Sequence, residues 1–151
     1  MIRTAKMLAL GTVLIGSVAI AATPAEYITA RQASYKQIGK AFKATIDEIK
    51  KSEPSVDVLR TNAATLNKLS HQVHRWFPKG SGPEAGVKTA ALPAIWEQWD
   101  QFRVRANTFA GQAQGLDAAA KKGDVAQVRA YVQGVGGACK GCHDNFRARG
   151  S

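Results

Sequence analysis

The stretch that decides the fold lies near the end of the chain, where residues 124–146 read DVAQVRAYVQGVGGACKGCHDNF. Its apolar side chains recur at steps of three and four residues, which places them on one face of an α-helix. This face consists of Val125, Val128, Val132, Val135, Cys139, Cys142 or His143, and Phe146. Asp124 is a favourable N-cap, because its carboxylate accepts hydrogen bonds from the free amides of a first helical turn. We therefore predict an amphipathic helix that begins at about residue 124 and packs one face into a core.

The same stretch carries the pentapeptide Cys139-Lys140-Gly141-Cys142-His143. The pattern C-x-x-C-H is typical of c-type haem attachment, in which two thiols add across the porphyrin vinyl groups and the histidine supplies an axial nitrogen to iron. Positions i, i+3 and i+4 share one face of a helix, so all three side chains can contact one planar ligand. We predict one covalent haem c, attached through Cys139 and Cys142 and ligated by His143.

Three other interpretations of the cysteine pair remain open at this stage. A zinc site needs four ligands, and His71 or His74 could join the cysteines and His143. A thioredoxin-like redox pair belongs at the start of a helix in an α/β fold, whereas this pair lies near the end of a helix. A structural disulfide is compatible with an exported protein, although a bridge over so few residues constrains little of the unfolded chain.

Glycines oppose the helix in this stretch, since each costs about 1 kcal/mol of helix propensity relative to alanine. They are Gly134, Gly136, Gly137 and Gly141. Two explanations are open. Either a haem or another part of the chain approaches closely at these positions, or the helix frays near the chain end.

Three further blocks repeat their apolar residues at helical spacing. The first begins with a capping box, Thr23 with Glu26, and with Pro24 at the first helical position, and it is broken by Lys51 to Pro54. The other predicted elements are a helix over residues 55–77, a glycine-containing loop over residues 78–91 and a helix over residues 93–121 that ends before Gly123. No block alternates with period two. We therefore predict an all-α fold, an antiparallel up-down-up-down four-helix bundle.

Residues 1–21 have the pattern of a secretory signal peptide. Arg3 and Lys6 precede an apolar run of about 15 residues that ends in Ala19-Ile20-Ala21, a small-x-small cleavage pattern. The run is shorter than the roughly 20 residues that a membrane-spanning helix needs. We expect cleavage before Ala22, a periplasmic location, no stable membrane insertion after cleavage, and one mature domain over residues 22–151.

The 151-residue chain carries 21 Lys and Arg against 11 Asp and Glu, a formal net charge of +10. The mature domain loses two of these bases, Arg3 and Lys6, and no acid, so its net charge is +8. Export, together with the scatter of the bases along the chain, argues against nucleic acid as a partner. A basic surface instead favours acidic partners or an anionic membrane face.

Both methionines of the chain, Met1 and Met7, lie in the expected leader, so residues 22–151 contain none. Methionine ligation, which makes many c-type cytochromes six-coordinate electron carriers, is therefore excluded. The remaining candidates for the sixth position are His71, His74 and the lysines. Isolated helical histidines are more often surface residues than ligands. We predict an iron whose sixth position is open and suited to small gases.

These features together resemble the cytochromes c′, the class II four-helix c-type cytochromes. The resemblance spans essentially the whole mature chain. It rests on Arg31-Gln32 early in the first helix, Pro93 to Trp96 at the start of the third, and the C-terminal C-x-x-C-H followed by Phe146-Arg147. It implies a five-coordinate high-spin iron that binds nitric oxide and carbon monoxide, in a periplasmic homodimer that is not an enzyme.

The resemblance also implies roles for single residues. Arg31, Gln32 and, more weakly, Thr89 are expected near the haem propionates, and the place of Arg31 on the apolar seam argues against an ordinary surface arginine. Tyr35 falls at the position of the family's distal blocking residue, and Arg147 matches its proximal base. Phe77, Phe102 and Phe109 are expected to line the haem. His74 falls where some members carry an aromatic residue beside the haem.

We therefore expect a haem protein that binds or sequesters nitric oxide, with electron transfer to an acidic redox partner as the competing function. Electron transfer would make the open iron position incidental and would use the basic surface for docking.

Overall fold

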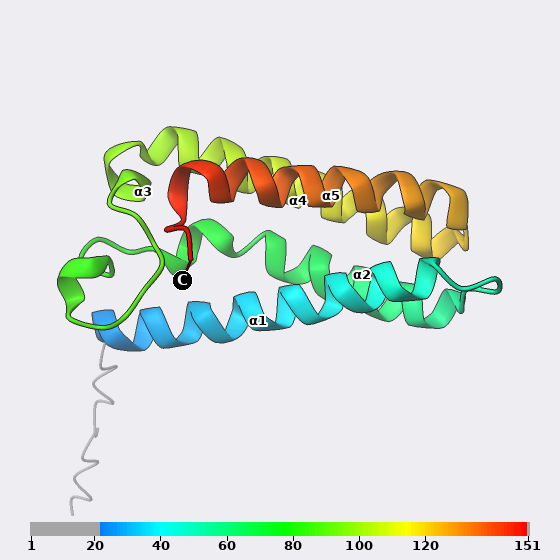
Figure 1. The fold of residues 1–151 in the computed structure, drawn as a ribbon, viewed down its shortest axis with the longest axis horizontal. Coiled ribbons are helices and arrows are strands. Elements are labelled where there is room, and N and C mark those ends of the chain that lie inside the picture. Colours follow the sequence, from blue (N-terminus) through cyan, green and yellow to red (C-terminus); the bar gives the residue numbers. More distant parts are fainter. Residues whose placement is uncertain (1–21, 151) are drawn as a thin grey trace, which may run out of the picture.

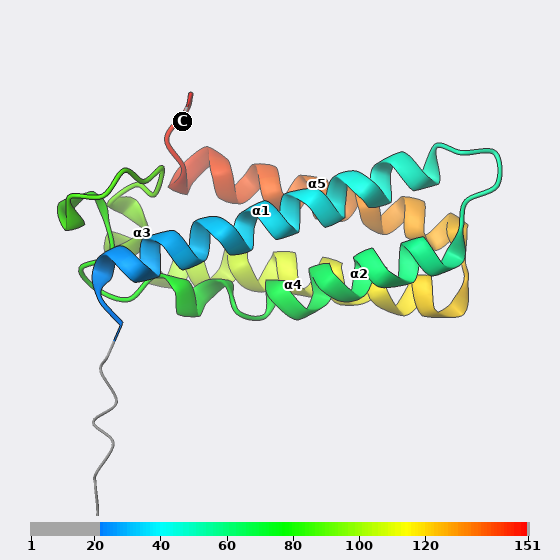
Figure 2. The ribbon, with the colours of Figure 1, turned by 90° about the horizontal axis from the view of Figure 1, so that it is seen from below.

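The computed structural model describes residues 22–150, and it confirms the predicted all-α bundle. Its long helices run along the long axis of the molecule (Figures 1 and 2). They are α1 (Pro24–Ile49), α2 (Val56–Ser70), α4 (Trp99–Lys122) and α5 (Val125–Phe146), with short helices η1 (Val73–Trp76), η2 (Pro83–Ala85) and α3 (Ala94–Glu97) between α2 and α4. Residues 22–150 contain no β-strand beyond one isolated bridge between Ala91 and Arg147. The expected signal peptide lies outside the described residues.

The predicted capping box at the start of α1 is confirmed. The backbone amide of Thr23 donates to Glu26 Oε2 at 2.6 Å, and the amide of Glu26 donates to Thr23 Oγ1 at 3.3 Å. At the other end, Glu48 is buried and accepts hydrogen bonds from Lys51 Nζ and from the Ser55 amide, both at 2.7 Å. These bonds hold the turn that reverses the chain into α2.

The second helix ends earlier than predicted. The expectation of one helix over residues 55–77 is wrong, because α2 ends at Ser70 and a separate 3₁₀ turn, η1, follows. The Ser70 hydroxyl donates to the carbonyl of Asn67 at 2.8 Å, a local side-chain bond that competes with continuation of the helix. The turn after Ser70 brings Val73 and Phe77 into the core.

The third helix is likewise interrupted. The predicted helix over residues 93–121 divides at Gln98 (φ −120°, ψ 46°) into α3 and α4. The short α3 positions the Trp96 indole so that its N–H donates to the carbonyls of Phe77 and Pro78, at 3.2 and 3.1 Å. The helix stop at Gly123 is confirmed, since this residue has φ 72° and its amide donates to the Ala120 carbonyl at 3.0 Å.

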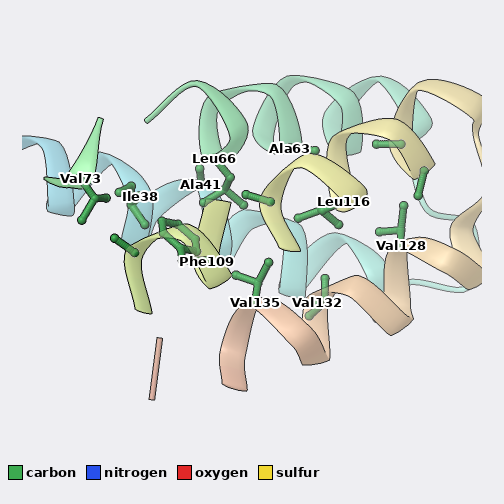
Figure 3. Close-up of a cluster of buried hydrophobic side chains, with 14 of the residues drawn as sticks. Ile38, Ala41, Ala63, Leu66, Val73, Phe109, Leu116, Val128, Val132 and Val135 are labelled. Carbon is green, nitrogen blue, oxygen red and sulfur yellow. The ribbon is translucent and has the colours of Figure 1, made fainter. Parts of the chain in front are cut away.

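The core forms where the apolar faces of the long helices meet (Figure 3). Leu66 of α2, Leu116 of α4 and Val135 of α5 are fully buried within it. Among residues 22–150, no helix is long and apolar enough to cross a membrane.

Fraying does not explain the glycines of α5, because the helix continues to Phe146. Close packing accounts for only part of them, since Gly136, Gly137 and Gly141 leave room for a methyl group. A methyl group at Gly134 would clash with the side chain of Gln112, and one at Gly115 would clash with the ring of Tyr131. The Gln112 amide can rotate away, whereas the Tyr131 ring is rigid, so glycine is needed for the close packing of α4 and α5 at Gly115.

Candidate functional site

A cavity of about 740 Å³ opens at the end of the bundle where α5 finishes. Its walls come from residues 31–42 of α1, residues 102–109 of α4, the end of α5, and the segment from η1 to α3. Cys139, Cys142 and His143 all line it, as expected for one helical face. The volume falls within the roughly 300–1,000 Å³ of protein sites that bind small molecules and cofactors.

The surroundings of the motif keep its groups in their neutral forms. Cys139 and Cys142 are half-buried. Burial raises the pKa of both thiols, and burial together with the neighbouring Cys139 raises the pKa of Cys142 to about 11. Partial burial of the imidazole, and then the positive charge of Arg147, lower the pKa of His143. A neutral imidazole is the form that coordinates a metal.

Arg31 lies buried on one side of this cavity, with only 2% of its surface exposed. Its guanidinium donates to Ser81 Oγ at 3.0 Å and to Thr89 Oγ1 at 2.8 Å, and it lies 4.6 Å from the centre of the Phe77 ring. Within residues 22–150, it forms no ion pair with a carboxylate. Because a buried cation with neutral partners is poorly compensated, this side of the cavity suits a carboxylate such as a haem propionate.

Two other residues expected near the propionates come together with Arg31. The Gln32 side-chain amide donates to the carbonyl of Lys88 at 2.9 Å, and Thr89 follows directly in the same loop. Gln32, Lys88 and Thr89 line the cavity together with Arg31. Helix α1 and the loop over residues 78–91 are thus joined at the predicted propionate side.

Tyr35 lies one helical turn after Arg31 and also lines the cavity. Its ring is packed edge-on against Trp76, with centroids 5.3 Å apart, and is tilted against Phe77 at 6.4 Å. Burial, more than the nearby Cys142, raises the pKa of the Tyr35 phenol well above its ordinary value. The hydroxyl therefore keeps its proton at neutral pH and can act as a hydrogen-bond donor.

The three predicted phenylalanines are buried in the cavity wall. The ring of Phe77 meets that of Phe102 at 5.0 Å, and Phe102 meets Phe146 at 5.4 Å, both edge to face. Phe109 lines the cavity about two helical turns after Phe102 in α4. Their contacts give the cavity an apolar wall.

Arg147 follows α5 and lies at two hollows. It lines the main cavity and a second one of about 330 Å³ that contains His143, Asp144 and the chain from Arg147 to Gly150. Backbone bonds hold it against the loop: the Leu92 amide donates to the Phe146 carbonyl at 3.1 Å, and the Ala148 amide to the Ala90 carbonyl at 2.8 Å. Arg147 and His143, the predicted iron ligand, thus line the same two hollows.

His71 and His74 do not belong to the cavity. Val73 and Phe77 line it, but neither histidine does, and His71 Nε2 instead lies 3.1 Å from Asn67 Oδ1. The part of the chain that the structure describes holds no cluster of three or more His, Cys, Asp or Glu able to bind a metal ion. The zinc alternative therefore has no ligand set within residues 22–150.

Other lining residues were not singled out from the sequence. Ile38 and Phe42 could have been inferred, because the α1 seam that contains Tyr35 also contains them. Lys36 and Arg105 lie off the apolar seams of their helices, and no sequence signal points to them. Only the packing of α1 and α4 around the end of α5 brings them to the cavity.

An all-helical bundle with a C-x-x-C-H motif on the wall of an aromatic cavity defines a class, the four-helix c-type cytochromes. The chain belongs to the cytochrome c′ family, since the family model described as Cytochrome C' matches residues 26–147. Membership implies haem c as the cofactor.

Known relatives agree with this assignment. The chain is 36% identical over 127 residues to cytochrome c' of Rubrivivax gelatinosus, covering 83% of this chain and 97% of the relative. The crystal structure of cytochrome c' from Rubrivivax gelatinosus superposes with a TM-score of 0.76, covering 82% of this chain and 96% of that one. A nitric oxide complex of a variant of cytochrome c prime from Alcaligenes xylosoxidans is 27% identical, with a TM-score of 0.76, covering 85% and 98%.

Proposed function

We propose that the mature chain is a periplasmic haem c protein that reversibly binds nitric oxide, and also carbon monoxide, and that it is not an enzyme. The observation that carries the proposal is the composition of the cavity. His143 is its single histidine, residues 22–151 contain no methionine, and Tyr35 lines the same cavity as His143. The bound haem would supply an iron atom at which a diatomic gas coordinates.

The chain's own residues have distinct tasks in this proposal. Cys139 and Cys142 hold the haem through thioethers, and His143 ligates the iron. Arg31, with Gln32 and Thr89 beside it, binds the propionates through charge-assisted hydrogen bonds. These assignments are supported by the shared cavity and by the buried cation of Arg31.

Selectivity would come from the remaining walls. The ring of Tyr35, packed against Trp76, narrows the space for a ligand, and its protonated hydroxyl donates a hydrogen bond to a bound gas. Phe77, Phe102 and Phe109 make the cavity apolar, which disfavours charged ligands. Arg147, near His143, provides a donor on the proximal side. The nitric oxide complex of the Alcaligenes relative supports this proposal by similarity.

The optical spectrum of the purified holoprotein tests this function. We expect a high-spin ferric spectrum at neutral pH and a stoichiometric spectral change when nitric oxide is added to the ferrous protein. A low-spin ferric spectrum would refute the open iron position. An intact mass without one haem would refute haem attachment.

Electron transfer is the second candidate, and the charge of the domain favours it. A formal charge of +8, or about +6 with two ionised propionates, suits an acidic redox partner. Cells lacking the protein distinguish the two functions. Increased sensitivity to nitric oxide with normal respiratory flux supports gas binding, whereas a loss of flux alone supports electron transfer.

We also propose that residues 1–21 are removed on export, that the mature domain spans residues 22–151 and that it assembles into a homodimer. The intact mass of the exported protein locates the cleavage site, which we expect before Ala22. Sedimentation equilibrium of the holoprotein tests the dimer.

A further inference from the structure

Every charged residue that lines the large cavity is basic. These residues are Arg31, Lys36, Lys88, Arg105 and Arg147, and no Asp or Glu of the described chain joins them. Arg31 is buried, whereas the other four are exposed. The cavity is therefore bordered by positive charge at the surface as well as inside.

Three of the exposed bases have no compensating partner. Lys36, Lys88 and Arg105 form no ion pair with any acid of residues 22–150. We refer to these three residues as the cationic rim. Their positive charge therefore faces solvent.

Three acids near this end of the bundle have other partners. Asp144 pairs with Lys140 at 2.5 Å, and Asp100 pairs with Arg103 at 3.8 Å. Glu84 accepts a hydrogen bond from the Gly82 amide in its own loop, at 3.1 Å. None of these acids forms an ion pair with the rim.

The two halves of the bundle differ in charge. When α1, α4 and α5 are divided near their midpoints and α2 four residues before its end, the half with the charged cavity residues comprises residues 22–37, 67–110 and 136–150. It contains 11 Lys and Arg against five Asp and Glu, while residues 38–66 and 111–135 contain eight against six. The net charge of the described chain, +8, therefore divides into +6 at the cavity half and +2 at the other.

We propose that the cationic rim is the docking surface for an acidic one-electron carrier protein, which passes an electron to the haem through the cavity opening. The inference rests on the proposed haem site. In the step, one electron leaves the partner's cofactor and reduces the ferric haem to ferrous, and no bond forms or breaks. A docked protein covers about 800 Å² on each side, so residues that border one cavity fall within one footprint.

Reduction of the ferric holoprotein by reduced flavodoxin, an acidic flavin protein, tests the proposal. Photoreduced lumiflavin, a small neutral flavin, serves as reference, and the ratio of the two rates corrects for changes in the haem itself. We expect this ratio to fall about tenfold between roughly 10 mM and 500 mM salt, because screening removes the steering of an anionic partner.

Two triple variants with equal net charge distinguish a local docking site from overall charge. Lys36→Gln/Lys88→Gln/Arg105→Gln removes the rim, and we expect it to lower the low-salt ratio about fivefold or more. Lys50→Gln/Lys122→Gln/Arg129→Gln removes three exposed bases of the other half, none of which forms an ion pair with acids of residues 22–150. We expect this control to change the ratio less than about twofold.

Equal losses in the two triple variants would overturn the proposal, as would a ratio that is independent of salt or that rises with it. These results are distinguishable from failure of the proposed function. If no haem is attached, lumiflavin reduction of the wild-type chain gives no haem signal. If the haem is attached and binds nitric oxide but the rim variant behaves like the control, only the docking site is wrong.

Discussion

Replacement of Arg31 by methionine is the most demanding test of the site. The change removes a buried guanidinium that donates to Ser81 at 3.0 Å and to Thr89 at 2.8 Å, and that lies 4.6 Å from the Phe77 ring centre. Methionine has a similar length and leaves little space empty. The variant therefore isolates the loss of charge and hydrogen bonds from the loss of packing.

The magnitude follows from these contacts. Hydrogen bonds to a charged group contribute about 1.5–3 kcal/mol each, and a desolvated cation–π contact about 2 kcal/mol. Relief of the desolvation of Arg31 offsets part of this sum, since burial of a charge costs several kcal/mol. We expect the holoprotein with Arg31→Met to lose about 2–4 kcal/mol of unfolding free energy, because a propionate is then also left without its cation.

Guanidinium chloride unfolding of the holoprotein, followed by far-UV circular dichroism, measures this loss. Arg60→Met is the matched control, because the Arg60 side chain is 47% exposed. It donates to the carbonyls of Ala120 and Lys121 at 3.3 and 3.1 Å and pairs with Asp57 at 3.2 Å. We expect the control to lose at most about 1 kcal/mol. If Arg31→Met lowers the unfolding free energy no more than Arg60→Met does, then the contacts of Arg31 with the loop and the haem site do not stabilise the fold.

Three further changes test other parts of the structure. Gly115→Ala should lower the unfolding free energy by about 1 kcal/mol, because the new methyl group clashes with Tyr131. Gly111→Ala should raise it by up to about 1 kcal/mol, because a methyl group there meets no neighbouring atom within 4 Å and alanine favours the helix. Equal effects of the two variants in thermal melts would contradict the packing at Gly115. Hydrogen bonds from Lys51 Nζ and then the Ser55 amide hold the pKa of Glu48 below its ordinary value. The ionised Glu48 therefore stabilises the folded protein above the unfolded carboxyl pKa of about 4.3, and this stabilisation is lost as the pH falls through the lower folded pKa. Glu48→Gln should therefore unfold more readily than wild type at neutral pH, with the difference vanishing in acid; a pH-independent difference would show that the carboxylate charge is not responsible. Tyr35→Phe keeps the ring but removes the hydroxyl, so stopped-flow kinetics should show nitric oxide dissociating about five- to tenfold faster, as expected for the loss of one hydrogen bond; unchanged rates would exclude that bond.

The ends of helices were predicted correctly where residues close in sequence determine them. The cap formed by Thr23 and Glu26 and the left-handed stop at Gly123 depend on residues close in sequence, and both are confirmed. The ends of the second and third helices were not predicted, because they depend on distant partners. The Trp96 indole, for example, bonds carbonyls 18 and 19 residues away, and no periodicity in the sequence reports such a bond.

The same distinction applies to the site. Spacing alone placed Cys139, Cys142 and His143 on one face, and resemblance to a family suggested Arg31 and Tyr35. The roles of these residues remain predictions, but the structure brings all five to one cavity. The sequence did not indicate Lys36 and Arg105 as cavity residues. A basic residue on the solvent-facing side of a helix fits the same sequence pattern whichever elements that helix packs against.

The sequence by itself determined the helical class, the haem motif and the lack of methionine in the mature domain, since periodicity, spacing and composition are properties of the chain alone. Only the tertiary structure decided that Arg31 is buried without an ion pair to a carboxylate of residues 22–150, and that His71 and His74 lie outside the cavity. It also decided that Lys36, Lys88 and Arg105 border the cavity and form no ion pair with those acids. The physical reason is that burial and charge compensation depend on groups brought together from α1, α4, α5 and the loop over residues 78–91. Those groups become neighbours only when the bundle closes.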